Sequence, residues 1–585
     1  MGQGSPRVPT LISKYRRYLT DYNSVLAYAV LGVIGGIASG LVVVLFEETI
    51  IQLAALLEVE DHADNFEALP ERWRFALPAL GALVLGIAFQ FLHAEQRETG
   101  IVHVISRMHS HYGALPARNA LVQFIAGAFA LATGQSGGRE GPGVHLGGAV
   151  NSLLGQRLSL PNNSLRMLIA CGAAGSISAA FNTPLAGVIF AMEVIAAEYT
   201  VAGFIPVMLA AVAASAVART INPGGSGFDI PPLELTSLWE LPYVMLLGFV
   251  CGFAVVAFIR LSKLTARQSK YNVILRFAMA GCLTGAIALL VPEVMGIGYD
   301  TLTMALRGEI VLWWLLAIAA AKIIATAITA GVGMPVGVIG PNLLIGGCIG
   351  GALGIVGQQF MPDYASGPTL YVVLGMGAAM AAVLNAPLAA LLAVIELTSS
   401  IGIGMPAMLA IVAANLTCSG LFRERSLHRT ILRQLRRLVP DDPLNQLLHR
   451  TQAAAIMDSR VVRVPTELGA DDHVTLLEST PTWCLVTREG EDLYLIRGDE
   501  LLEWMALTPD AESFDVTNAD IRRWTFTNVP LQASLRQVMD SITRRTTEAA
   551  CIYERSRSAK QPVLHGVVTR EAIEKFTLGR LQAEE

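Results

Sequence analysis

Three ionisable residues stand close together in a glycine-rich stretch of an otherwise apolar sequence. The stretch is GQSGGREGPGVHLGG, residues 134–148, and it holds Arg139, Glu140 and His145. Ionisable side chains inside apolar segments are costly and usually functional. Because Pro142 suits the first turn of a helix, we predict a helix that begins here, inside the apolar region. The unpaired N–H groups and partial positive charge of such a helix start attract anions.

Each of these residues then has an expected task. The carboxylate of Glu140 is an anion tethered beside the donors, so it competes with a permeating anion and protonation removes it. We therefore predict that Glu140 acts as a gate, a proton carrier or both. Gly141 lets the backbone approach the ion closely, and Arg139 supports the loop or adds positive potential. We expect His145 to be a polar packing residue.

The composition indicates a polytopic helical membrane protein. The chain is 53% hydrophobic and 15% charged, whereas soluble domains are about 25% charged. Several apolar blocks approach the roughly 20 residues that cross a bilayer. A net charge of −5 argues against a nucleic-acid partner, and the seven cysteines lack metal-ligand spacing, so we expect no metal. Basic residues at 7–17 and 423–437 flank the spans, which predicts that both termini are cytoplasmic.

The apolar region is a duplication. Residues 172–194 are similar to residues 375–397, at a shift of 203 positions, and both contain the pattern N-x-P-L-A. A second glycine-proline break, GVIGP, stands in the second half at 337–341. Paired interruptions indicate a site at the repeat interface near the midplane of the membrane.

The composition changes sharply near Pro440, where charge rises and short strand-like runs begin. We therefore predict four regions. A cytoplasmic segment at 1–22 precedes a transmembrane anion-transport domain at about 23–438, whose repeats span about 25–225 and 238–438. A linker at 439–450 then leads to a soluble α/β regulatory domain at 451–580.

The motifs GREGP, GVIGP and the repeated N-x-P-L-A resemble those of the CLC family of chloride channels and chloride/proton exchangers. The resemblance covers about residues 25–438. It implies an all-α inverted-repeat fold of about eighteen helices with broken half-helices, a homodimer, and one anion path in each subunit with Glu140 as the external gate. It also implies an integral protein of the inner (plasma) membrane, here of a bacterium. The family's second motif is usually G-x-F-x-P, and here Ile339 replaces the aromatic residue. The resemblance still implies that the backbone amides of Val338 and Ile339 face the anion.

Two departures from the family pattern concern the anion. The family's G-S-G-I-P motif is replaced by Glu98-Thr99-Gly100-Ile101-Val102, in which Thr99 keeps the hydroxyl that coordinates the anion. The family's pore tyrosine matches His428, which can still donate a hydrogen bond and whose charge varies with pH. Chloride is the default anion, and nitrate, bicarbonate and fluoride stay open.

A third departure concerns protons. Exchangers of the family usually carry a glutamate immediately after the position of Glu193, and here that residue is Val194. A valine cannot relay a proton, which favours passive, channel-like conduction. The alternative is chloride/proton antiport, with water or a nearby carboxylate such as Glu193 or Glu198 as the relay. We expect Glu193 and its repeat partner Glu396 to hold helix ends or the dimer.

The tail resembles a pair of CBS modules. One begins at AAAIMDSRVVRVPTEL and the second contains VLHGVVTREAIEKF. Such pairs dimerise and often bind adenine nucleotides. The aspartate that often holds the ribose is replaced by Ala572, three residues after Thr569. We therefore expect either a nucleotide site or a regulatory platform without a ligand, and no other cofactor.

A rival hypothesis from another class is an intramembrane serine hydrolase. GQSGG matches the G-x-S-x-G elbow, with Ser136 as the nucleophile. That elbow needs a strand before it, whereas the preceding FIAGAFALAT is typical of a membrane helix. The motif also leaves the duplication unexplained, so we expect no enzyme.

Overall fold

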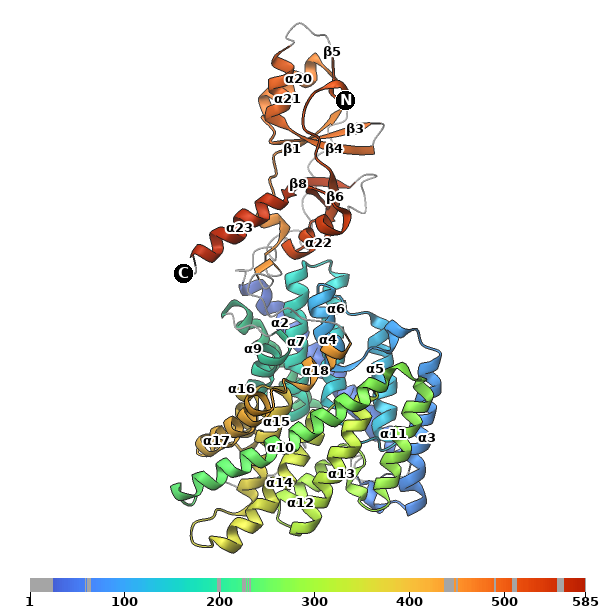
Figure 1. The fold of residues 1–585 in the computed structure, drawn as a ribbon, viewed down its shortest axis with the longest axis vertical. Coiled ribbons are helices and arrows are strands. Elements are labelled where there is room, and N and C mark those ends of the chain that lie inside the picture. Colours follow the sequence, from blue (N-terminus) through green and yellow to red (C-terminus); the bar gives the residue numbers. More distant parts are fainter. Residues whose placement is uncertain are drawn as a thin grey trace. The chain divides into compact units, whose positions relative to one another are not determined.

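The computed structural model describes residues 25–57, 59, 65–196, 201–223, 228, 230, 233–435, 447–448, 451–488, 491–507, 513–554 and 562–583. The predicted segment at 1–22 and nearly all of the predicted linker at 439–450 therefore lie outside the described residues. The chain divides into two compact units. One spans Asn23–Ser159 and Ser164–Val439 and is helical, and the other contains Pro440–Glu585 and both β-sheets and helices (Figure 1).

The described residues of the first half of the helical unit form eight α-helices. They are α2 (Val25–Leu56), α3 (Glu71–Gln90), α4 (Gly100–Ser110), α5 (Ala117–Ala132), α6 (Glu140–Arg157), α7 (Asn162–Phe181), α8 (Pro184–Phe190) and α9 (Val201–Ile221), with a π-helical turn η3 (Ala191–Ala196) after α8.

The second half repeats this order. Its helices are α10 (Leu241–Ala266), α11 (Val273–Ala288), α12 (Tyr299–Leu306), α13 (Leu312–Gly331), α14 (Ile339–Phe360), α15 (Pro368–Leu384), α16 (Pro387–Thr398) and α17 (Gly404–Asn415), followed by a π-helical turn η7 (Leu416–Leu421) and α18 (Leu427–Gln434).

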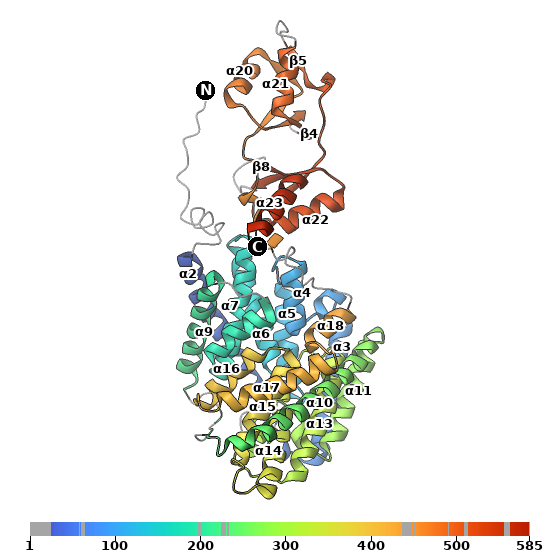
Figure 2. The same ribbon diagram turned by 60° about the vertical axis from the view of Figure 1, so that its left-hand side comes forward.

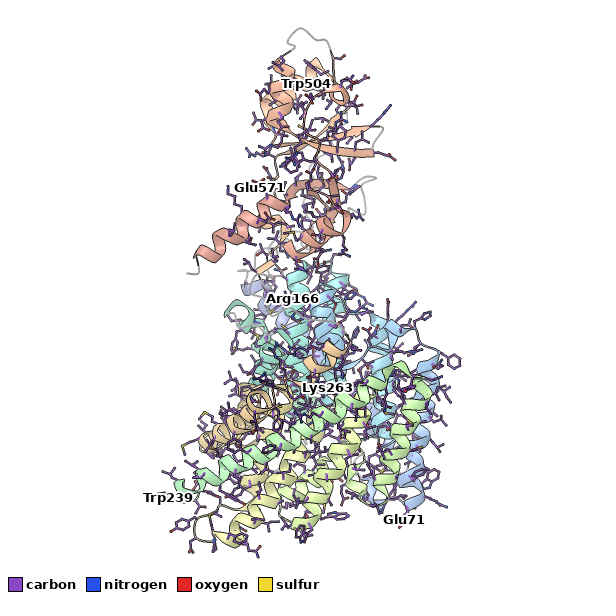
Figure 3. All side chains as sticks on the ribbon, in the orientation of Figure 1. Glu71, Arg166, Trp239, Lys263, Trp504 and Glu571 are labelled. Carbon is purple, nitrogen blue, oxygen red and sulfur yellow. The ribbon has the colours of Figure 1, made fainter. Side chains whose placement is uncertain are left out.

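The packing of the two halves is also repeated. Helix α2 packs against α9 and α6, and α10 packs in the same way against α17 and α14. Helix α2 begins at the end of the unit where Arg166 lies, and α10 begins at the opposite end, beside Trp239 (Figures 2 and 3). The second repeat is therefore inverted relative to the first, as expected from the sequence.

The N-x-P-L-A pattern explains one helix boundary in each repeat. Asn182 and Asn385 follow α7 and α15 with φ of 58° and 56°, the left-handed conformation that asparagine tolerates and that ends helices. Pro184 and Pro387 then begin α8 and α16, where the missing proline N–H costs nothing.

Within the described residues, eight helices are long and apolar enough to cross a membrane. Many of their apolar side chains face outward, among them Leu45, Leu80 and Phe253. In water such surface would be unfavourable, whereas in lipid it is the expected outer face. The helical unit is therefore the transmembrane part of the chain.

The second unit contains two similar sheets. In one, β1 (Val461–Pro465) pairs parallel with β3 (Trp483–Arg488), which pairs antiparallel with β4 (Glu491–Arg497). In the other, β6 (Phe526–Pro530), β7 (Ala549–Glu554) and β8 (Val563–Thr569) pair in the same pattern.

Two helices go with each sheet. Those of the first sheet are α20 (Ala470–Ser479) and α21 (Gly498–Ala506), and those of the second are α22 (Leu535–Arg545) and α23 (Arg570–Ala583). A further short strand pair is formed by β2 (Glu467–Gly469) and β5 (Ser513–Asp515). Trp483 and Leu495 of the first sheet pack with Cys551 and Val567 of the second in one buried cluster. This repeated α/β arrangement fits the CBS pair expected from the sequence.

Candidate functional site

The two glycine-proline breaks meet in space, 199 residues apart along the chain. Gly138 N donates to Gly337 O at 2.8 Å, and Gly337 N donates to Gly138 O at 2.6 Å. Helices α6 and α14 begin two residues beyond this pair, at Glu140 and Ile339. The two helix starts predicted from the sequence therefore lie side by side, and both are buried.

Glycine is required at this crossing because the backbones touch. A Cβ on Gly141 would lie 2.7 Å from Gly337 Cα, and a Cβ on Gly337 would lie 2.6 Å from Gly141 N. Real Cβ atoms do not approach backbone so closely, so both positions exclude every side chain. Gly141, which we predicted to let the backbone approach the anion, allows the two helix starts to approach each other.

Glu140 reaches across from its own helix to the other one. The side chain is 1% exposed, and its Oε2 accepts a hydrogen bond from Gly340 N at 3.2 Å. Its Oε1 accepts from the hydroxyl of Tyr299, the first residue of α12. The carboxylate thus accepts a hydrogen bond from an amide at the start of α14, the kind of donor that we expect an anion to use. The amides of Val338 and Ile339, which we expect to face the anion, directly precede Gly340, and that expectation stays a prediction.

Arg139 is engaged in supporting contacts. Its Nε lies 3.4 Å from Glu47 Oε1 on α2, and its guanidinium lies 5.5 Å from the centre of the Tyr299 ring. A cation in this position adds positive potential to the site and holds the Tyr299 ring. These contacts agree with a supporting role for Arg139 beside Glu140.

Thr99 stands at the start of α4, as the residue before its first turn. The following residue, Gly100, has a φ of +71°, and its N–H donates to Gln123 Oε1 at 2.7 Å. Gln123 Nε2 in turn donates to Pro335 O at 3.0 Å, just before the second break. The buried Gln123 of α5 therefore links the Thr99 segment to the loop before α14.

His428 lies in the first turn of α18 and is 5% exposed. Helix α18 packs against α4, so His428 belongs to the same part of the fold as the Thr99 segment. Its Nδ1 is buried and has no hydrogen-bond partner among the described residues. A buried polar atom of this kind is costly unless an anion or water satisfies it. This favours the role expected for the residue at the family's tyrosine position.

Val194 lies half-buried in the π-helical turn η3, which packs against α4. Its apolar side chain offers no titratable group at the position where exchangers of the family carry a glutamate. Glu198, the more distant carboxylate considered above, lies outside the described residues.

Glu193 and Glu396 hold helix ends, and each holds the helix start of the opposite repeat. Glu193 accepts hydrogen bonds from the N–H groups of residues 388–389, at the start of α16, at 3.4 and 2.9 Å. Glu396 accepts from residues 185–186, at the start of α8, at 2.9 and 2.8 Å. The duplication thus produces a reciprocal pair of caps between the two halves.

We predict that Glu396→Gln destabilises the folded protein. A carboxylate accepts two N–H groups, whereas glutamine presents an oxygen to one and an NH₂ donor to the other. Loss of one charge-assisted bond costs about 2 kcal/mol, and the thermal unfolding midpoint in detergent should fall measurably. Glu309→Gln, at an exposed position, is the matched control. Equal thermal unfolding midpoints for the two variants would show that the Glu396 cap contributes nothing to the stability of the fold.

Sequence reasoning missed three residues of this region. Tyr299 and Gln123 carry no local signal, because their partners lie far away along the chain. Lys322 did carry one, since it is the single charged residue of the apolar block at 312–330. It is fully buried, and its Nζ donates to the carbonyls of Val294, Met295 and Gly296 at 2.9–3.3 Å. It thereby supports the loop that leads to Tyr299.

Ser136 does not have the surroundings of a hydrolase nucleophile. The residues before it form the helix α5, in place of the strand that the elbow requires. Its hydroxyl lies 2.8 Å from the hydroxyl of Thr326 on α13, so it joins the two repeats. The residue is a structural contact.

In the second unit, Thr569 ends β8, and its hydroxyl accepts a hydrogen bond from Ala572 N at 3.2 Å. The threonine therefore caps the start of α23, and Ala572 supplies no carboxylate there. The predicted nucleotide site stays a prediction.

Two inverted halves, two opposed helix starts and a carboxylate between them define a membrane anion transporter. A model of the voltage-gated chloride channel family matches residues 80–419, and the chain belongs to this family, the CLC proteins. Membership confirms the fold class and anion transport that the sequence motifs implied, and it replaces the hydrolase hypothesis.

Among individual relatives, a chloride channel protein named ClcB-like from Ralstonia nicotianae is 33% identical over 399 residues, covering 66% of this chain and 92% of the relative. The H(+)/Cl(−) exchange transporter ClcA of Vibrio cholerae is 29% identical over 435 residues, covering 72% of this chain and 92% of that protein. The crystal structure of a eukaryotic CLC transporter has a TM-score of 0.56 at 19% identity and covers 96% of this chain and 99% of its own. That structure supports the fold of both units.

Proposed function

We propose that this protein exchanges chloride for protons across the membrane, with Glu140 as the group that alternates between the anion position and a protonated, displaced state. The observation that carries the proposal is the bond from Gly340 N to Glu140 Oε2. A carboxylate that occupies an anion-binding amide leaves it when protonated, so anion entry and proton uptake are linked at one residue.

Exchange is favoured here over the passive conduction that Val194 suggested. The V. cholerae relative, which covers most of this chain, is named an H(+)/Cl(−) exchanger. The argument from Val194 requires that a carboxylate at that position is the only possible proton relay, and water or other titratable groups could serve. We further propose a homodimer in the inner membrane with one anion path in each subunit, and cytoplasmic termini.

The test is transport by the purified protein in liposomes loaded with chloride, followed by chloride and pH electrodes together. We expect protons to move opposite to chloride in a fixed ratio, and a chloride gradient to drive protons uphill. Chloride efflux without proton movement would establish passive conduction instead. Repeating the assay with nitrate, bicarbonate and fluoride ranks the anions.

A further inference from the structure

Two buried histidines from different helices are bonded to each other beside the site. His103 lies on α4 and His145 on α6, with Nδ1 of His103 at 2.8 Å from Nε2 of His145. The ring centres are 5.1 Å apart and the ring planes are inclined by 29°, and the residues are 2% and 0% exposed. Since an imidazole can take a proton on one nitrogen and release one from the other, such a pair can pass protons.

The neighbouring donors assign the position of each ring proton. Arg107 Nε donates to His103 Nε2 at 3.2 Å, so that nitrogen accepts. The proton of a neutral His103 is then on Nδ1, which donates to His145 Nε2. The proton of His145 is consequently on Nδ1, and this buried atom has no hydrogen-bond partner among the described residues. Each donor in this series therefore faces the same way, from Arg107 Nε to His103, from His103 Nδ1 to His145, and outward from His145 Nδ1.

One end of the pair is close to a carboxylate with access to solvent. Glu98 Oε2 lies 3.7 Å from His103 Nε2, and the side chain of Glu98 is 21% exposed, compared with 1% for His103. Glu98 directly precedes Thr99. Glu98 is thus the more exposed end of this arrangement and lies next to the Thr99 segment.

The other end of the pair lies on the same helix as the gate. His145 is five residues beyond Glu140 in α6, about 7.5 Å along the helix axis. A buried N–H group without a partner costs free energy unless water satisfies it. The relay proposed below therefore takes water as the link between His145 Nδ1 and Glu140.

Other charged groups lie on the elements that pack against the helices of the pair. Besides the pair itself, the charged and titratable residues on the described helical elements packed against α4 and α6, and on those two helices, are Tyr28, Glu47, Glu48, Arg118, Glu193, Cys348, His428, Arg429, Arg433, Arg107, His109, Arg157 and Glu140. Glu47 is paired with Arg139, and Glu193 accepts from the start of α16. Glu98 is the carboxylate beside the pair itself.

We propose that His103 and His145 relay protons between Glu98 and Glu140, in place of the carboxylate that Val194 does not supply. A proton binds Nε2 of His103, whose Nδ1 proton passes to Nε2 of His145, whose Nδ1 proton leaves through water to Glu140. The hydrogen bond from Arg107 Nε to His103 Nε2 breaks when the proton binds that nitrogen. The pair gains one proton and loses one, so its charge is unchanged, and ring reorientation restores the starting tautomers.

The relay rests on the proposed exchange and is tested in the same liposome assay with His145→Gln and His103→Gln. Glutamine keeps hydrogen-bonding capacity but cannot carry a proton. We expect the ratio of proton to chloride movement to fall about tenfold or more, while chloride still moves. His109→Gln is the matched control, because His109 lies on the same helix and its Nδ1 lies 2.9 Å from its own helix at Ile105 O.

The outcomes separate the two proposals. If the unaltered protein moves chloride without protons, exchange is wrong and the relay falls with it. If the unaltered protein exchanges and both variants keep its proton-to-chloride ratio, the relay alone is wrong. A merely structural pair would lower thermal stability or the rates of both ions together and leave their ratio unchanged. The two variants alter different helices, so either one that folds suffices for the test.

Discussion

Glu140→Gln should abolish proton movement and leave chloride movement in place. Glutamine has nearly the same shape, so the helix starts at Glu140 and Ile339 stay packed. It is always neutral, so it neither competes with an anion as a charge nor takes up a proton. We expect proton flux to fall about a hundredfold, the scale of losing a positioned proton-transfer group, and chloride flux to lose its dependence on pH.

The control for this change is Glu48→Gln, an exposed carboxylate of α2. It should leave both fluxes unchanged. Electrodes for chloride and pH in the same liposome experiment report both quantities. If the Glu140→Gln protein elutes as a folded species yet passes no chloride, Glu140 is not a gate. If it still moves protons against chloride, another residue carries them.

Gly138→Ala should nearly stop the movement of both ions. A Cβ at this position would lie 2.2 Å from Glu140 Oε2, 3.0 Å from Pro341 Cδ and 3.2 Å from Gly340 N. The methyl group would displace the flexible carboxylate and then fill the space beside Gly340 N that an anion needs. We expect chloride turnover to fall by about tenfold or more, as for overpacking of a filled site. Chloride binding, measured by titration calorimetry, should weaken in parallel.

Gly143→Ala provides the matched control on the same helix. A Cβ there would be 3.8 Å from the nearest atom, Val43 Cγ2, which is an ordinary contact. The backbone φ of Gly143, like that of Gly138, is not positive. Alanine therefore causes no backbone strain at either position, and the two variants differ in the contacts of the added methyl group. Should the two variants conduct chloride equally, the space beside Gly340 N is not part of the path.

Much of the architecture was predictable because its signals are local or repeated. Glycine followed by proline inside apolar segments marks a helix start in the membrane, and Glu140 stands out there by its charge alone. The shift of 203 residues between the two N-x-P-L-A patterns indicates the duplication without any contact being known. The strands of the second unit were likewise predictable from short β-branched runs such as residues 563–569.

The tertiary structure alone decided which groups meet. Gly340 N and the Tyr299 hydroxyl reach Glu140 only because the second repeat is inverted and its helix start opposes that of the first. The inversion also explains the reciprocal caps, because it lets Glu193 accept hydrogen bonds from the start of α16 and Glu396 from the start of α8. His103 and His145 come together because α4 packs on α6. Sequence spacing sets what a residue can do within its own helix, whereas contacts between distant helices depend on how apolar surfaces pack, and no local pattern records that.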